Sequence, residues 1–234
     1  MLTERPEYEA WKEWLEEDFG RFSSDQEAYY RAEVVARCAG VSSTRILEVG
    51  FGNGSLLGFS KSLGWQVAGV ELNPVLRQRA EGAGIEVFDS TALLPADSFD
   101  VAVALDVMEH VPDGEGIRFL SDIKRSLRPG GLLILRFPNG DSPFGRALQY
   151  GDVTHVSVVG SVKIQYFARG AGLRLVEMAN QRAPTAHLPT VLRLKRELRK
   201  AGQRGLEALL GKTFYDGRRP LGQNLVTVLH KPQA

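Results

Sequence analysis

The sequence predicts an α/β fold, in which a mostly parallel sheet is covered by helices on both faces. Short apolar runs alternate with helical stretches from Arg45 onward. The runs are apolar throughout, as expected of strands that are buried on both faces. The first run also leads through a glycine-rich turn directly into a helical pattern, which is typical of a strand-to-helix crossing. The chain has 234 residues, of which 43% are hydrophobic and 24% charged, a composition that suits one large globular domain.

The expected elements follow one another in a regular order. Two helical patterns open the chain, at residues 8–15 and 28–39. We expect strands at residues 45–50, 65–72, 85–88, 99–106 and 131–137, with helices at 55–63, 74–83 and 116–127 between them. Pro74 suits the first turn of a helix, and the sequence RPGG at 128–131 is expected to end a helix and turn the chain.

The second half of the chain contains an insertion. A loop rich in Pro, Gly and Ser (138–145), a helix (161–171) and a strand (173–178) precede a basic segment and a last strand at 224–230. The predicted organisation is therefore a helical cap (1–40), an α/β core (41–181), a basic helical insertion (182–222), and a closing strand with its tail (223–234).

The glycine turn and the second strand indicate that the protein binds a nucleotide. Gly50 and Gly52 fit the dinucleotide fingerprint G-x-G-x-x-G, but Ser55 stands at its third glycine, and no Walker A sequence is present. Glu71 ends the second strand, 21 residues after Gly50, where a carboxylate can accept hydrogen bonds from both ribose hydroxyls. This spacing suits adenosine in general, including that of NAD.

Two later features narrow the choice of nucleotide. Asp89 follows the third strand, where its carboxylate could hold an adenine amine, although an acid at such a position is also typical of a turn. The fourth strand ends in LDVMEHVPD, a patterned loop at the sheet edge where ligands of open α/β folds bind.

Four successive segments, ILEVGFGNG, VAGVELNP, FDVAVALDVMEHVPD and LRPGGLLILRFPN, resemble the motifs of class I S-adenosylmethionine-dependent methyltransferases. Their order and spacing match from about residue 28 to 178. The resemblance implies a Rossmann-like three-layer sandwich around a seven-stranded sheet, with an antiparallel last strand. It also implies S-adenosylmethionine as cofactor and S-adenosylhomocysteine as product.

The resemblance also implies the positions of the cofactor-binding residues. It places Glu48, Gly50, Phe51, Gly52, Asn53 and Gly54 around the methionine moiety, Glu71 on the ribose with Leu72 in the same site, Asp89 and Ser90 near adenine, and Leu105 and Asp106 beneath the ligand. The helix before the first strand, with its two tyrosines, commonly covers the cofactor in this family, although core packing explains one of these tyrosines equally well.

The sequence after the fourth strand argues against a planar amino group as the methyl acceptor, but it does not fix whether the acceptor atom is oxygen, nitrogen or carbon. Methyltransferases that act on planar amino groups often carry Asp/Asn-Pro-Pro-aromatic at this position, where this chain has DVMEH. The chain is therefore more similar to the O-methylating branch, which includes quinone, sugar and lipid-linked glycan methyltransferases. We expect a small-molecule or lipid-linked acceptor.

Two histidines are candidates for the catalytic base. His155 lies in a D-x-x-H segment, where Asp152 could fix its tautomer, and a structural role for His155 is an equal alternative. For His110, the lower-ranked candidate, packing beside the cofactor is the favoured interpretation. We expect no metal site, because Asp152 and His155 lack other evident ligands in the sequence. Cys38, the single cysteine, excludes an internal disulfide and any multi-cysteine site.

The charge of the chain is concentrated in the insertion. The formal net charge is +1, but residues 182–219 hold ten basic and three acidic residues and so carry +7. Apolar residues recur at helical spacing between these charges, on both sides of an expected break at Gly202. We expect residues 186–212 either to contact an anionic membrane surface or to pack on the domain. Nucleic acid is disfavoured as a partner, because no aromatic residue lies among the charges before Phe214.

No secretory signal and no membrane-spanning run is visible, so the expected location is cytoplasmic, with peripheral contact at the inner face of the membrane. Two alternatives to an O-methyltransferase remain open. One is a regulatory member of the family that binds the cofactor without catalysis, and the other is an RNA methyltransferase. A nicotinamide oxidoreductase is disfavoured by Ser55.

Overall fold

The computed structural model describes residues 16–38, 44–215, 217 and 219–233. Their centre is a seven-stranded sheet with the order β3-β2-β1-β4-β5-β7-β6, in which β7 runs antiparallel to both of its neighbours. The strands are β1 (Arg45–Val49), β2 (Gln66–Val70), β3 (Glu86–Phe88), β4 (Phe99–Leu105), β5 (Leu127–Pro138), β6 (Arg174–Asn180) and β7 (Asn224–His230). The predicted Rossmann-like fold, with its antiparallel last strand, is confirmed.

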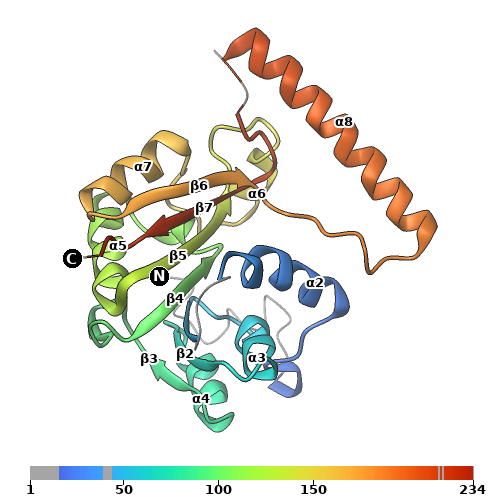
Figure 1. Ribbon diagram of the computed structural model, residues 1–234. Coiled ribbons are helices and arrows are strands. Elements are labelled where there is room, and N and C mark those ends of the chain that lie inside the picture. The colour runs from blue at the N-terminus through green and yellow to red at the C-terminus, as the bar shows by residue number, and fades with distance from the viewer. Residues whose placement is uncertain (1–15, 39–43, 216, 218, 234) are drawn as a thin grey trace.

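Helices cover both faces of this sheet, which gives three layers (Figure 1). The larger core cluster joins one face of the sheet to α5 (Gly116–Ser126) and α7 (Ser161–Gly170). A second cluster joins the other face to α2 (Ser24–Glu33) and α3 (Ser55–Ser62). A third cluster packs α4 (Pro74–Gly82) against α3. The layers bring the carboxyl ends of β1, β2 and β4 to one edge of the sheet.

The N-terminal helices differ in their bounds from the predicted ones. The pattern at 8–15 lies outside the described residues, which begin with the short 3₁₀ helix η2 (Glu16–Asp18). The helix expected at 28–39 starts earlier, because Ser23 and Gln26 form a capping box at the start of α2. It ends at Glu33 and is followed by the 3₁₀ helix η3 (Val35–Arg37), which leads to the buried Cys38.

Two connections in the second half of the chain also differ from expectation. β5 begins before the RPGG sequence, and residues 128–131 form an irregularity between the pairings of Leu127 and Leu132 with β4. The stretch after β5 contains a short helix, α6 (Arg146–Gly151), which no periodic pattern indicated. Six residues are too few for helical periodicity to stand out in a sequence.

The basic insertion forms α8 (Thr190–Phe214), a single helix of 25 residues. The expected break at Gly202 is wrong, since a glycine within a helix costs only about 1 kcal/mol relative to alanine. α8 follows β6 and precedes β7 in the chain, and Figure 1 shows it projecting from the domain. Its apolar side chains are largely exposed, so the alternative in which they pack on the domain is also wrong. Within the described part of the chain, no helix is both long and apolar enough to cross a membrane.

Candidate active site

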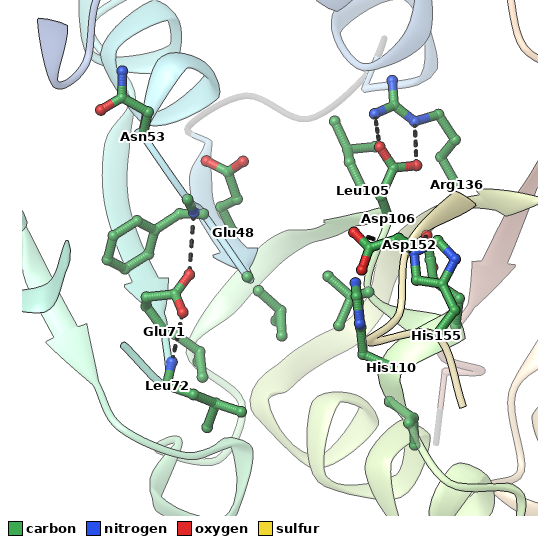
Figure 2. Close-up of a pocket in the computed structure, with 18 of the residues that line it drawn as sticks. Glu48, Asn53, Glu71, Leu72, Leu105, Asp106, His110, Arg136, Asp152 and His155 are labelled. Atoms are coloured by element: carbon green, nitrogen blue, oxygen red, sulfur yellow. Dashed lines mark hydrogen bonds and ion pairs between the residues drawn. The ribbon is translucent and has the colours of Figure 1, made fainter. Parts of the chain in front are cut away.

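A cavity of about 1280 Å³ lies at the carboxyl edge of the sheet. Its walls come from the ends of β1, β2 and β4, from residues 18–30, and from α6 with the loop that follows it. Ligand cavities of proteins commonly have volumes of about 300 to 1,000 Å³, so this one has room for a cofactor and a second molecule. Figure 2 shows two groups of polar side chains that face each other across it.

The glycine turn forms the floor of one half of the cavity. Gly50, Gly52 and Gly54 all have positive φ angles, of 71°, 51° and 69°. A Cβ atom on Gly50 would lie only 2.6 Å from Cγ2 of Val107, in the loop after β4. Glycine is therefore required at residue 50 both by the left-handed backbone and by the close approach of a neighbouring loop.

Glu71 holds the turn in place from the end of β2. Its Oε2 accepts a hydrogen bond from the Gly52 amide at 3.1 Å. Its Oε1 accepts hydrogen bonds from the amides of Leu72 (2.8 Å) and Asn73 (3.0 Å). Burial raises the pKa of Glu71, and the three amide donors act against that rise. The carboxylate predicted to bind ribose therefore also shapes the turn that it faces.

Asp106 follows β4 and occupies a strained backbone conformation, with φ of 59°. Its carboxylate forms a two-point ion pair with the guanidinium of Arg136, which comes from β5. Bidentate pairs of this kind fix geometry as well as charge. Arg136 also lies over the ring of Tyr29, 5.3 Å from its centroid. The sequence pointed to Asp106 but offered no signal for Arg136, which lies on a neighbouring strand.

The structure brings most of the predicted cofactor residues to this cavity. The residues that line it are Glu48, Gly50, Phe51, Gly52, Asn53, Glu71, Leu72, Ser90, Leu105 and Asp106, together with both histidine candidates. Gly54 and Asp89 are not among the lining residues, and Asp89 is not buried. The Ser90 hydroxyl accepts a hydrogen bond from the Ala92 amide at 3.1 Å, so it caps a short 3₁₀ helix. Contact of Asp89 with adenine stays a prediction.

The N-terminal segment closes over the glycine turn. The hydroxyls of Tyr30 and Ser55 lie 2.6 Å apart. The side-chain amide of Asn53 donates to the carbonyl of Asp18 at 3.0 Å. Ser55 thus links α3 to the covering helix α2. It stands where the dinucleotide fingerprint has its third glycine. This role was missed, because it depends on a residue 25 positions away in the sequence.

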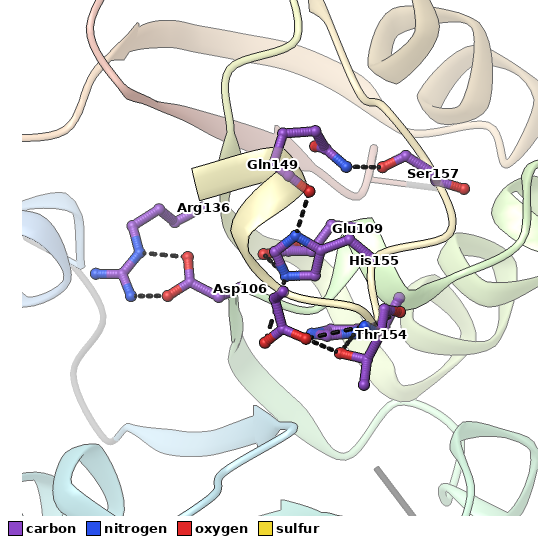
Figure 3. Close-up of polar contacts among 9 residues, drawn as sticks. Asp106, Glu109, Arg136, Gln149, Thr154, His155 and Ser157 are labelled. Carbon is purple, nitrogen blue, oxygen red and sulfur yellow. Dashed lines mark hydrogen bonds and ion pairs between the residues drawn. The ribbon is translucent and has the colours of Figure 1, made fainter. Parts of the chain in front are cut away.

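The two histidines lie together in the other half of the cavity, with ring centroids 4.8 Å apart (Figure 2). Nδ1 of His155 lies 2.9 Å from the backbone carbonyl oxygen of Gln149 (Figure 3). Since a carbonyl can only accept, Nδ1 is the protonated nitrogen, and the lone pair of neutral His155 is on Nε2. Nδ1 of His110 lies 3.1 Å from the Thr154 hydroxyl, which donates to Asp152, and 3.2 Å from the Thr154 carbonyl. The same reasoning makes Nδ1 the donor in His110.

Acidic groups surround Nε2 of His155. Oε1 of Glu109 lies 3.9 Å from it and Oδ2 of Asp152 lies 4.0 Å from it. Glu109 is buried, and its Oε2 has no hydrogen-bond partner among the described residues. Burial, reinforced by the charge of Asp106, raises the pKa of Glu109 to about 8.

Glu109 escaped the sequence prediction, although it precedes His110 directly. It lies in η5 (Met108–His110), and its backbone carbonyl accepts hydrogen bonds from the amides of Val156 and Ser157. These bonds fold the D-x-x-H segment onto η5 and so bring His155 to the cavity. Glu109, His110 and His155 each offer an atom suited to a metal ion, all within 4.8 Å of one another. The prediction of no metal site considered only Asp152 and His155.

The family follows from these features together with one comparison. A family model described as a methyltransferase domain matches residues 22–203, a range that includes the glycine turn, Glu71 and both histidines. The chain belongs to this methyltransferase family. S-adenosylmethionine-dependent methyl transfer is therefore its activity, as the sequence motifs predicted.

Named relatives and solved structures agree with this assignment. The methyltransferase is 28% identical over 170 residues to a ubiquinone biosynthesis O-methyltransferase of Xanthomonas axonopodis pv. citri, covering 64% of this chain and 70% of the relative. Over 97 residues it is 33% identical to the protein of the same name from Paramagnetospirillum magneticum, covering 38% of each.

Among solved structures, a SAM-dependent methyltransferase from Archaeoglobus fulgidus superposes with a TM-score of 0.61 at 17% identity, covering 92% of this chain and 97% of that one. A protein solved in complex with the Haloferax volcanii Trm112 methyltransferase activator gives a TM-score of 0.65 at 16% identity, covering 98% of both chains. At such identities the structures support the fold alone.

The residues of the cavity fit S-adenosylmethionine. Glu48 is buried in its wall, and Oε2 of this carboxyl has no partner among the described residues. Burial, with a smaller contribution from the charge of Glu71, raises the pKa of Glu48 well above its usual range. The methionine moiety of the cofactor carries an ammonium group and a sulfonium, and positive charge is what a buried, unpartnered carboxyl requires. Glu48 and the glycine turn would hold that end of the cofactor, and Glu71 the ribose.

Proposed function

We propose that this methyltransferase methylates an oxygen atom of a small-molecule or lipid-linked acceptor, and that His155 removes the acceptor proton. When bound, S-adenosylmethionine supplies an electrophilic methyl group on sulfur. The protein has to orient the acceptor hydroxyl, exclude water and take up the proton. The names of the relatives support an oxygen acceptor, since the matching proteins are O-methyltransferases.

The observation that carries the role of His155 is its fixed tautomer in the cavity wall. The Gln149 carbonyl holds the proton on Nδ1, which leaves Nε2 able to accept one. Once Nε2 is protonated, the nearby carboxyl of Asp152 stabilises the imidazolium charge. His110 has the lower claim to the role of base, because Thr154 binds it as a structural partner.

Apolar side chains around α6 support an acceptor with a hydrophobic part. Phe144, Leu148, Tyr150, Val153 and Val156 are all exposed, in or next to α6 and the loop that carries His155. Leu148 also lines the cavity. Exposed apolar groups at the mouth of a site favour an acceptor that brings its own apolar surface. A lipid-linked acceptor would place the enzyme at the inner face of a membrane.

The test is transfer of labelled methyl from S-adenosylmethionine into an extract of the native host, partitioned into lipid, water-soluble, protein and RNA fractions. We expect label in the lipid or the water-soluble fraction. His155→Gln should lower kcat by about 10² to 10⁴, the usual contribution of a general base, with unchanged affinity for S-adenosylmethionine. His187→Asn is the matched control, since His187 is not among the residues that line the cavity.

Other results would replace this proposal. Label in the RNA fraction would favour an RNA methyltransferase. No label in any fraction, from a protein that still binds the cofactor, would favour a regulatory member without catalysis. A His155→Gln variant that retains its kcat would remove His155 from the role of base.

A further inference from the structure

An exposed apolar stripe runs along α8. Val191, Leu194, Leu198 and Leu209 are 81%, 61%, 65% and 62% exposed. Their spacing of three or four residues, filled in by Ala201 and Gly205, places them on one face of the helix. From Val191 to Leu209 the stripe is about 27 Å long, at 1.5 Å per residue. An apolar row of this length on a projecting helix marks a surface that meets a partner.

The opposite face of α8 is attached to the domain. Near its start, Arg196 forms an ion pair with Asp25 of α2 at 3.2 Å. Near its end, Glu207 accepts hydrogen bonds from the Asn180 side chain (2.6 Å) and the Leu221 amide (3.0 Å). Arg196 and Glu207 lie about 180° around the helix from the stripe, at 100° per residue. The helix is thus held at both ends with the stripe directed outward, and turning the stripe inward would break these contacts.

The charges beside the stripe define what it can meet. α8 contains seven basic and two acidic residues, a net charge of +5. Arg196 and Lys200 form the ion pairs found in this helix. Lys195 and Arg199, about 60° and 100° around the helix from the stripe, form no ion pair with any described residue, and both are exposed. A second copy of the helix would set +5 against +5, so the charge favours an anionic partner over self-association.

We propose that α8 is a docking helix for an anionic lipid bilayer. Its apolar stripe enters the boundary between headgroups and acyl chains, and Lys195 and Arg199 reach lipid phosphates and carboxylates from its flank. This inference goes beyond methyl transfer and does not depend on which acceptor is methylated.

The C-terminal end of α8 joins this surface to the active site. The hydroxyl of Tyr215 donates to the carbonyl of Asp141 at 3.4 Å, so the helix ends beside the loop that leads into α6. Phe214 and Phe144, on the two sides of this contact, are exposed. The C-terminal end of α8 therefore lies close to the loop that leads to the cavity.

The experiment is sedimentation of the full-length protein with vesicles, without cofactor or acceptor. Vesicles of phosphatidylcholine with about one third phosphatidylglycerol should bind it, and vesicles of phosphatidylcholine alone should not. Reversal of Lys195 and Arg199 to Glu should weaken binding at least about 25-fold, because each basic residue near an anionic surface contributes roughly fivefold. Leu194→Ser with Leu198→Ser, which keeps all charges, should also weaken binding.

The control reverses two exposed basic residues on other elements, Arg169→Glu on α7 and Arg174→Glu on β6, and should bind as the parent does. Circular dichroism of each variant checks that it is folded. No sedimentation of the parent with anionic vesicles would overturn the inference. So would a parent that dimerises in solution through Leu194 and Leu198, since the stripe would then be covered by a second copy. Because methyl transfer is not measured, failure here leaves the proposed function standing.

Discussion

Replacement of Glu109 by Gln should change how the stability of the protein depends on pH. The Glu109 side chain is almost completely buried beside the cavity, and burial, followed by the charge of Asp106, raises its pKa from 4.5 to about 8. The folded protein therefore retains the proton of Glu109 over a range in which the unfolded chain releases it. A glutamine side chain at this position would keep nearly the same shape without a proton to lose.

The sign and the size of the effect follow from these two pKa values. The stability that comes from the bound proton is fully present below about pH 4.5, declines as the pH rises, and is lost above about pH 8. A shift of about 3.5 units corresponds to about 5 kcal/mol, at 1.36 kcal/mol per unit. Between about pH 6 and pH 8 the free energy of unfolding changes by roughly 2.3 kcal/mol, because about half of the folded molecules still hold the proton at pH 8.

Urea unfolding of the wild type and of Glu109→Gln at several pH values between about 6 and 8 measures this difference. The variant should gain roughly 2.3 kcal/mol relative to the wild type across that range. Glu81→Gln, which removes an exposed carboxyl on α4, is the matched control. A difference between wild type and Glu109→Gln that stays constant with pH would refute the reasoning. It would mean that Glu109 is ionised in the folded state and that a positive charge compensates it.

Three further predictions concern the cavity. Gly50→Ala should destabilise the fold by about 1 to 3 kcal/mol more than Gly64→Ala in thermal unfolding, since both glycines have positive φ but only the Cβ at residue 50 meets another side chain, that of Val107. Glu48→Gln should weaken S-adenosylmethionine binding by roughly tenfold or more in calorimetry, because a charged hydrogen-bond partner contributes about 1.5 to 3 kcal/mol; unchanged affinity would exclude contact with the cofactor cation. Dialysis against EDTA should leave methyl transfer unchanged if His155 is the base, whereas a loss that Mg²⁺ restores would assign the role to an ion beside His155.

The cofactor half of the site was predictable because its determinants are local in sequence. The carboxyl ends of parallel strands lie at the same edge of a sheet. A glycine turn after one buried strand and a carboxylate at the end of the next therefore come together there, independently of the conformation of the other loops. Gly50, Glu71 and Asp106 therefore line the same cavity, and their contacts with the cofactor stay a prediction. Arg136 could not be predicted, because its pairing with Asp106 depends on the register of β4 against β5, which places Leu105 opposite Arg136.

The acceptor half of the site is a tertiary feature. His155 reaches the cavity only because the amides of Val156 and Ser157 bind the carbonyl of Glu109, which lies far earlier in the chain. Its tautomer depends on the Gln149 carbonyl, in a short helix that no pattern indicated. The D-x-x-H sequence marked the histidine, but the acids around its Nε2 come from two separate segments.

The sequence by itself determined the α/β fold and a basic helix with an apolar stripe, because periodicity and the backbone requirements of glycine and strand ends act over a few residues. The cofactor was implied by the resemblance of four motifs to a known family. Only the tertiary structure decided which way the stripe on α8 faces. Helical periodicity places residues on a common side, but the direction of that side is set by partners such as Asp25 and Asn180, which are distant in the chain. Local sequence patterns do not predict such contacts, because they form only when the elements pack against one another.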